Sequence, residues 1–247
     1  MKLKPGFNTP GFFISNTYHC VENQRQITQL DANIKAAQST HTMTDKSLIS
    51  DIAFTPEVKA EQEKNQSRAF YQAAMEERDW LDHVTQDLRV RLAEADSFYL
   101  ATVGSDDHPY IQHRGGPRGF LVPLDDKRLA FADFSGNQQF VSLGNLATNS
   151  KAHIFIMDYA NKQRVKLWGN IEVSEATPEL VEKLTHPKYL AKVERVFIFT
   201  LSAWDLNCPQ HIPHKVDIRD VKQAITQLTM RVKELEEENA ELRSFVK

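Results

Sequence analysis

The sequence predicts a mainly β protein with helices before the β region and one long helix after it. From Ser97 onward, seven short runs rich in aromatic and β-branched residues follow one another, each bounded by Gly, Pro, Asp or Asn. Apolar residues have helical spacing before this region and a heptad spacing after it. Seven runs within about a hundred residues favour a closed or nearly closed antiparallel barrel.

Composition divides the chain into four segments. Residues 1–45 are rich in Asn, Gln, Thr and Ser and are expected to form a weakly ordered arm. We expect a helical lead-in over 46–95, the barrel domain over 96–214 and a coiled coil over 215–247.

Helix starts can be placed from capping residues. Thr55 followed by Pro56 is typical of a helix start, and a second helix is predicted over 86–94. Two more helices are expected inside the barrel region, near 137–149 and from Thr177. The stretch after Pro56 has apolar residues at helical spacing: Val58, Phe70, Ala74 and Trp80.

Charge and cysteine content limit the function classes. The net charge is -3 and the pI is about 6.3, so no basic field favours nucleic acid or an anionic membrane. The two cysteines, Cys20 and Cys208, give neither a disulfide framework nor a metal-binding spacing. The apolar patch at 12–14 is too short for a signal sequence, and no run approaches transmembrane length. We therefore expect a cytoplasmic protein.

A candidate anion site begins in "PYIQHRGGPRGF" at 109–120. Arg114 and Arg118 can meet phosphate oxygens in a fork geometry. Gly115 and Gly116 remove side chains where a planar ligand or a phosphate could approach the main chain. A tight turn alone would give the same pattern.

The next part of the candidate site lies in "FADFSGNQQFVSLGNL". A strand ending at Asp133 leads into a helix expected to begin near Asn137, where free N–H groups favour an anion. The amides of Asn137, Gln138 and Gln139 would donate further hydrogen bonds.

The third part is "RVKLWGNIEV". A period of two places Arg164, Lys166 and Trp168 on one face of a strand, and Gly169 would let a flat group approach the backbone. A solvent-facing strand surface is the alternative.

The stretch "NCPQHIPH" carries Cys208, His211 and His214. A C-x-x-H pair with one further His is a poor ligand set for a metal ion. We predict no metal site.

The C-terminal segment has a heptad pattern. Ile218, Ile225, Val232, Asn239 and Val246 occupy a positions, and the d positions hold Val221, Leu228, Leu235 and Leu242. β-branched residues at a with mainly Leu at d favour a parallel two-stranded coiled coil, and one buried Asn at a fixes the register.

Charges flanking the heptads agree with this arrangement. Arg231 faces Glu236 of the partner and Glu238 faces Arg243, and Asp217 with Lys222 would add a third pair. A solvated amphipathic helix folded back on its own domain is the alternative.

Six motifs occur in an order that resembles one branch of the pyridoxamine 5'-phosphate oxidase-like FMN-binding split barrels. The resemblance covers residues 52–214 and implies a six-stranded split β-barrel, a homodimer with two FMN sites at the subunit interface, and no metal. The motifs are "PYIQHRGGP" (109–117), "FADFSGNQQ" (131–139), "GNL" (144–146), "MDY" (157–159), "WG" (168–169) and "NCPQHI" (207–212).

The resemblance also implies residue roles. The strand at 112–114 would contact the isoalloxazine edge and the phosphate, and 137–139 stand where relatives use Ser-Arg-Lys to hold phosphate. Two amides replace two charges there, so the phosphate would depend more on Arg114, Arg118 or Lys166. Arg164 stands where the family often has a flavin-contacting Gln, and "NCPQHI" lies where a neighbouring subunit would complete the site.

Residue patterns and resemblance together give a set of predicted FMN-binding residues. No catalytic residue is assigned. The set is Gln112, His113, Arg114, Gly115, Asn137, Gln138, Gln139, Arg164, Lys166, Trp168, Gln210 and His211.

The function expected from this site is that of an FMN-dependent oxidoreductase acting on an unknown small substrate, with a nicotinamide as one candidate electron donor. A coiled coil replaces the C-terminal Arg-Leu-x-Pro end of the true oxidases, so their specific activity is not expected. One alternative is a flavin- or haem-binding module without turnover, with His113, His211 or His214 as candidate iron ligands. Another is a scaffold whose barrel is empty.

Overall fold

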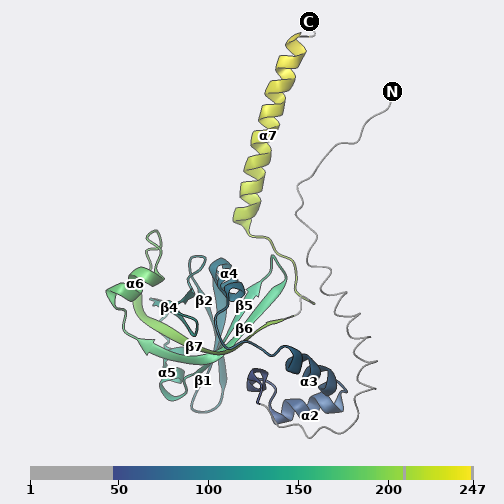
Figure 1. The fold of residues 1–247 in the computed structure, drawn as a ribbon. Helices are drawn as coiled ribbons and strands as arrows, with labels where there is room; N and C mark the ends of the chain where they lie inside the picture. The colour runs from purple at the N-terminus through teal and green to yellow at the C-terminus, as the bar shows by residue number, and fades with distance from the viewer. Residues whose placement is uncertain (1–46, 208–209, 246–247) are drawn as a thin grey trace. The chain divides into compact units, whose positions relative to one another are not determined.

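The computed structural model describes residues 47–207 and 210–245 (Figure 1). The predicted arm at 1–45, Cys208 and Val246 lie outside the described residues. The helical elements are η1 (Ile49–Ile52), α2 (Pro56–Lys64), α3 (Arg68–Glu77), α4 (Gln86–Glu94), α5 (Val141–Thr148), α6 (Pro178–Leu184) and α7 (Ile218–Phe245). The strands are β1 (Ser97–Val103), β2 (Pro109–Gly115), β3 (Val122–Pro123), β4 (Arg128–Phe134), β5 (Lys151–Asp158), β6 (Gln163–Ser174) and β7 (Val193–Asn207).

All seven strands form one antiparallel sheet in the order β2-β1-β5-β6-β7-β4-β3, with β2 and β3 at its two ends. The mainly β fold class is therefore confirmed, but the sheet is open, because β2 and β3 at its two ends do not pair with each other. Each of the seven aromatic runs contains one strand, as their number predicted. The count of six strands, which came from the family resemblance, is wrong for this chain because a two-residue segment, β3, pairs with β4.

The core lies on the inner face of the curved sheet, where α4 packs against it (Figure 1). Leu88 and Leu92 of α4 are fully buried. Alternation along β6 buries Val165 and Leu167 and leaves their neighbours partly exposed, as the period of two predicted. The four aromatic side chains that fill the centre are Phe98, Phe131, Phe197 and Phe199.

The lead-in contains two helices before α4 where a continuous helical spacing was predicted. Thr55 caps α2 as expected, because its hydroxyl accepts a hydrogen bond from the Val58 amide. The helical path breaks at Gln66, whose φ is 60°, after the Asn65 side chain has bonded back to the Glu61 carbonyl at 2.8 Å. Asn and Ser favour such local bonds over helix continuation. The helix predicted over 86–94 is confirmed as α4.

The loop before α5 differs from the prediction. The helix begins at Val141 and not near Asn137, because Gln138 and Phe140 adopt positive φ angles of 58° and 54°. The residues expected at a helix N-terminus therefore lie in a loop. The prediction at Thr177 is confirmed, since its side chain accepts from the Leu180 amide at the start of α6.

Two glycines serve the fold instead of leaving space for a ligand. A Cβ on Gly169 would lie 2.2 Å from the Thr200 carbonyl oxygen, at a point where the pairing of β6 and β7 shifts register. A Cβ on Gly116 would lie 2.7 Å from the Phe120 ring. The expectation that these positions admit a flat group is wrong, because strand and ring atoms already occupy the space.

The long C-terminal helix begins at Ile218, as the heptad predicted, and extends to Phe245. Its apolar side chains are exposed along most of its length. Within the described ranges, no helix combines the length and the apolar character needed to cross a membrane.

Candidate functional site

A pocket of about 190 Å³ opens between β2, β4, β7 and the loop leading into α5. Alternation along β2 turns Gln112 and Arg114 toward it, because they pair with the buried residues Leu100 and Phe98 of β1. The lining residues are Gln112, Arg114, Asp133, Phe134, Gly136, Asn137, Gln138, Phe140, Ser142, Leu143, Glu194, Arg195 and Phe197.

The centre of this pocket is a carboxylate held by two arginines. The Asp133 side chain is only 9% exposed, and its Oδ1 accepts a hydrogen bond from Arg114 Nη1. Its Oδ2 accepts from Arg195 Nη1 at 2.7 Å. Arg195 Nη2 in turn donates to Glu194 Oε2 at 3.1 Å. These contacts thus join residues from β2, β4 and β7.

The charges of the lining balance. Two arginines face two carboxylates, so the formal net charge of the pocket is zero. The guanidinium of Arg114 lies 5.2 Å from the centre of the Phe197 ring, and that of Arg195 lies 5.3 Å from the Phe140 ring. Arg114 Nε is buried without a hydrogen-bond partner. The pocket therefore offers donors held in place by rings and a carboxylate, but no excess positive charge.

Amide groups complete the pocket. Gln112 Oε1 accepts a hydrogen bond from Ser142 Oγ at 2.7 Å, which ties β2 to α5. Asn137 Oδ1 accepts from the main-chain N–H of Gln139 at 3.2 Å, which shapes the loop. Four of the predicted site residues, Gln112, Arg114, Asn137 and Gln138, thus line one pocket.

Four other predicted residues lie on the outer face of the same sheet. His113 alternates away from the pocket and makes an edge contact with Tyr99, with 5.8 Å between ring centres. Arg164, Lys166 and Trp168 share the partly exposed face of β6, as predicted. They are not among the residues that line the pocket.

Aromatic rings already contact Trp168. Trp80, from the segment between α3 and α4, stacks on it with ring centres 4.7 Å apart. His153 on β5 meets it edge-on at 4.8 Å. A flavin could reach this ring only by extending or displacing the stack.

Three ionisable groups share this outer face. Lys166 lies opposite Asp205 in the pairing of β6 with β7. Burial lowers the pKa of Lys166 and raises the pKa of Asp205, so desolvation outweighs their mutual attraction. Burial, together with the charge of Lys166, lowers the pKa of His153 to about 4, which keeps its imidazole neutral at pH 7.

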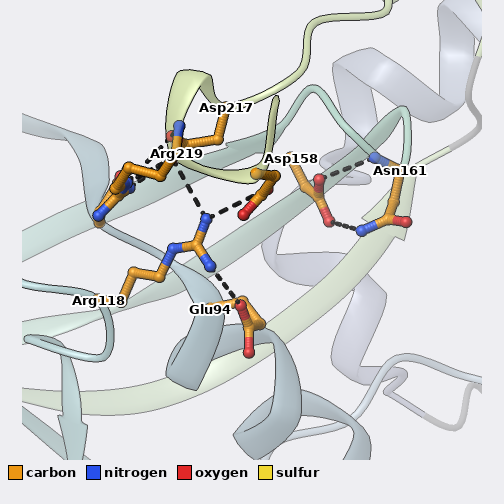
Figure 2. A network of polar contacts seen from close by, with 8 residues as sticks. Glu94, Arg118, Asp158, Asn161, Asp217 and Arg219 are labelled. Atoms are coloured by element: carbon orange, nitrogen blue, oxygen red, sulfur yellow. Dashed lines mark hydrogen bonds and ion pairs between the residues drawn. The ribbon is translucent and has the colours of Figure 1, made fainter. Parts of the chain in front are cut away.

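The remaining predicted residues lie outside the pocket. Gly115 faces the His113 ring, which would be 3.2 Å from an added Cβ. Gln139, Gln210 and His211 are exposed, and His211 has a φ of 61°. Arg118, expected near a phosphate, instead contacts Glu94 and Asp217 (Figure 2). In the part of the chain that the structure describes, no three His, Cys, Asp or Glu side chains gather to hold a metal ion.

Three charged residues of the pocket were not predicted. Asp133 was recognised only as a strand end, and Glu194 and Arg195 were counted only within a strand. The sequence feature that could have identified these three residues is a charged residue inside an apolar run. Such a charge becomes buried or half-buried and therefore requires a partner in the folded protein. The sequence does not identify that partner, because β2, β4 and β7 meet only through the barrel fold.

Comparison with known proteins finds one matching family model. Residues 84–206 match the family model described as pyridoxamine 5'-phosphate oxidase. No curated protein sequence matches the chain.

Similar solved structures include three bacterial proteins. HupZ of Group A Streptococcus is 19% identical, with 53% of this chain and 98% of that chain covered and a TM-score of 0.40. A putative pyridoxamine 5'-phosphate oxidase of Lactobacillus delbrueckii is 19% identical (51% and 95% covered, TM-score 0.39). An FMN-binding protein of Syntrophomonas wolfei is 14% identical (59% and 97% covered, TM-score 0.40). The match to the pyridoxamine 5'-phosphate oxidase family model covers residues 84–206, just under half of the chain.

Proposed function

We propose that the protein is an FMN-binding flavoprotein and acts as an oxidoreductase on a small substrate. The observation that carries this proposal is the pocket in which Arg114 and Arg195 are held around Asp133 inside the family domain. Preformed guanidinium donors beside amides are suited to the oxygens of a phosphate group.

The residues present fit the phosphate end of FMN. Each arginine has five N–H donors, and the Asp133 and Glu194 bonds use only part of them. Asn137 and Gln138 add amide donors in the same pocket. Since the lining has no net charge, binding would depend on directed hydrogen bonds more than on electrostatic attraction.

This pocket is too small for the whole cofactor. Pockets for drug-sized ligands commonly measure about 300–1,000 Å³, and this one measures about 190 Å³. We therefore propose that a second copy completes the site and that the protein is a homodimer. The outer face with Arg164 and Lys166 is the surface we propose for the ring end, because it is partly exposed and carries hydrogen-bond donors.

Bound FMN would supply hydride and electron transfer. The chain's own residues would bind and orient it. Arg114 would hold the phosphate, and Gln112 would be fixed by its bond to Ser142. His153, neutral at pH 7, can donate one hydrogen bond and accept another beside Lys166 on the outer face.

A second candidate is a haem- or flavin-binding module without turnover. The observation that favours it is His113, which is exposed on the outer face between two exposed apolar side chains, Tyr99 and Ile111. An imidazole in such surroundings could serve as an axial ligand. A cytoplasmic location is also part of the proposal.

The first test is the absorption spectrum of the purified protein, with mass spectrometry of whatever heat releases. A flavin spectrum with the mass of FMN supports the proposal, and a Soret band would support the haem candidate. Reduction of bound flavin by NADH or NADPH would then separate an oxidoreductase from a binding module.

A titration tests the phosphate assignment. Arg114→Ala removes a charge-assisted contact of roughly 1.5–3 kcal/mol and should weaken FMN binding about ten- to a hundredfold. Riboflavin, which lacks the phosphate, should bind both proteins equally. Arg128→Ala is the matched control, because Arg128 lies on β4 but is exposed and outside the pocket. Equal losses for FMN and riboflavin would contradict the assignment.

A further inference from the structure

The long helix α7 presents an apolar stripe that its own domain does not cover. Ile225 is 57% exposed and Leu228 is 67% exposed, although both are large apolar residues. We propose that this stripe is the interface of a parallel two-stranded coiled coil formed with α7 of a second copy. The proposal goes beyond flavin binding and does not require it.

The stripe has the length and chemistry of such an interface. Its 28 residues span about 42 Å at 1.5 Å per residue, which is four heptads. Exposed β-branched residues occupy the a positions Ile218, Ile225 and Val232, and leucine predominates at d. This distribution favours two strands over three or four. A second copy supplies an identical stripe, so the two surfaces match without any other partner.

Asn239 determines the orientation of the pair. It occupies an a position, and within one chain its Nδ2 donates to the Leu235 carbonyl at 2.9 Å. In a parallel pair a positions face each other, so the two Asn239 side chains can hydrogen-bond across the interface. In an antiparallel pair a positions face d positions, which hold only Val and Leu here. That arrangement would bury the amide against apolar side chains without a partner on the other helix.

The flanking charges agree with a parallel pair. Arg231 at g would face Glu236 of the second copy, and Glu238 would face Arg243. Within one chain, Arg231 Nη1 donates to Glu234 Oε2 at 2.9 Å. Exposed pairs of this kind add little stability, but they select the partner and the register.

The first turn of α7 is anchored to the barrel domain by an ionic network (Figure 2). Arg118 contacts both Glu94 and Asp217, at 3.5 and 3.2 Å. Arg219 donates to Asp96 and Asp217, at 3.0 Å in each case. Hydrogen bonds from Arg219 hold the pKa of Asp217 well below its usual range. Asp217, which was predicted to pair with Lys222 of the partner, therefore already has partners within its own chain.

This anchor connects the coiled coil to the candidate site. Arg118 lies three residues beyond the end of β2, which carries Gln112 and Arg114. The paired helices would therefore start from fixed points on the two barrel domains, next to the strand that lines each pocket.

Cysteine cross-linking of the full-length chain tests the proposal. In a protein with Cys20→Ser and Cys208→Ser, a single Leu242→Cys change places one thiol at a d position. In a parallel, in-register pair the two d-position thiols meet and should form a disulfide-linked dimer under mild oxidation. The matched control is Glu241→Cys, one residue earlier at a c position that faces away. We expect most of the first variant and little of the second to be linked.

A second pair of variants guards against a local effect of the first. Leu235→Cys and its control Glu234→Cys repeat the comparison one heptad earlier. The proposal would be overturned if neither d-position thiol formed a cross-link, or if the thiols at d positions and at control positions cross-linked equally. FMN titration of the same proteins shows separately whether the proposed flavin site exists, so failure of one idea is distinguishable from failure of the other.

Discussion

The Asp133→Asn substitution should weaken the fold and tighten FMN binding at the same time. Asp133 is 9% exposed, and the two arginines it holds, Arg114 and Arg195, are 15% and 21% exposed. Removing one partner of a buried charge pair costs about 3–5 kcal/mol. The Asn carbonyl still accepts one hydrogen bond, so we expect a loss near about 3 kcal/mol.

The gain in affinity follows from the charge of the pocket. Asn at position 133 changes the net charge of the lining from zero to one positive charge and frees a guanidinium for the phosphate. One additional charge-assisted hydrogen bond contributes roughly 1.5–3 kcal/mol, or about ten- to a hundredfold in affinity. Urea unfolding of the flavin-free protein measures the first effect. FMN fluorescence quenching measures the second.

Two comparisons make the prediction strict. Glu194→Gln gives the same net charge but leaves Asp133 holding both arginines, so it should tighten FMN binding less. Riboflavin binding should not respond to either change. If folded Asp133→Asn protein binds FMN no better than the original, or if riboflavin gains by the same factor, the phosphate does not lie in this pocket.

Three further predictions concern stability. In urea unfolding, Gly169→Ala should destabilise the fold by more than about 3 kcal/mol, because the new Cβ would lie 2.2 Å from a carbonyl oxygen of β7. Gly144→Ala should instead stabilise α5 by about 0.5–1 kcal/mol, because its new Cβ would have no atom within 4 Å. The pKa of His153 falls from 6.5 to about 4 on folding, so the unfolded chain binds more protons between these values and the free energy of unfolding should decrease as the pH falls from 6.5 to 4. At about 1.4 kcal/mol per pKa unit the decrease is at most about 3.5 kcal/mol, and nearer to about 1–2 kcal/mol for a half-buried ring. A slope unchanged in His153→Gln would contradict this assignment. Thr85→Ala should cost about 1 kcal/mol and lower the melting temperature, because the Thr85 hydroxyl accepts a hydrogen bond from the Leu88 amide at the start of α4; no change would show that water replaces this cap.

Local patterns in the sequence predicted the elements well. The strands followed from their aromatic and β-branched runs, and the caps at Thr55 and Thr177 were right because a cap depends on residues three positions apart. The start of α5 was wrong because positive φ at Gln138 and Phe140 is not encoded in residue type.

The candidate site was predictable only in part. Gln112 and Arg114 were found because they adjoin glycines in one motif, but Asp133 and Arg195 join them through strands far apart in sequence. Gly169 was misinterpreted because the sequence does not distinguish a glycine required by the close approach of a neighbouring strand from a glycine required by a ligand.

The stack of Trp80 on Trp168 makes the intrinsic tryptophan fluorescence of the protein a probe of one region of its structure. The chain has three tryptophans, and the third, Trp204, donates from Nε1 to the His83 carbonyl at 3.0 Å. All three rings therefore lie where residues 80–83 meet β6 and β7, while no tryptophan lines the pocket. Intrinsic emission consequently reports on the junction of the lead-in with the barrel. A change in emission that precedes the loss of β-sheet circular dichroism would show residues 80–83 leaving the barrel while its strands are still paired.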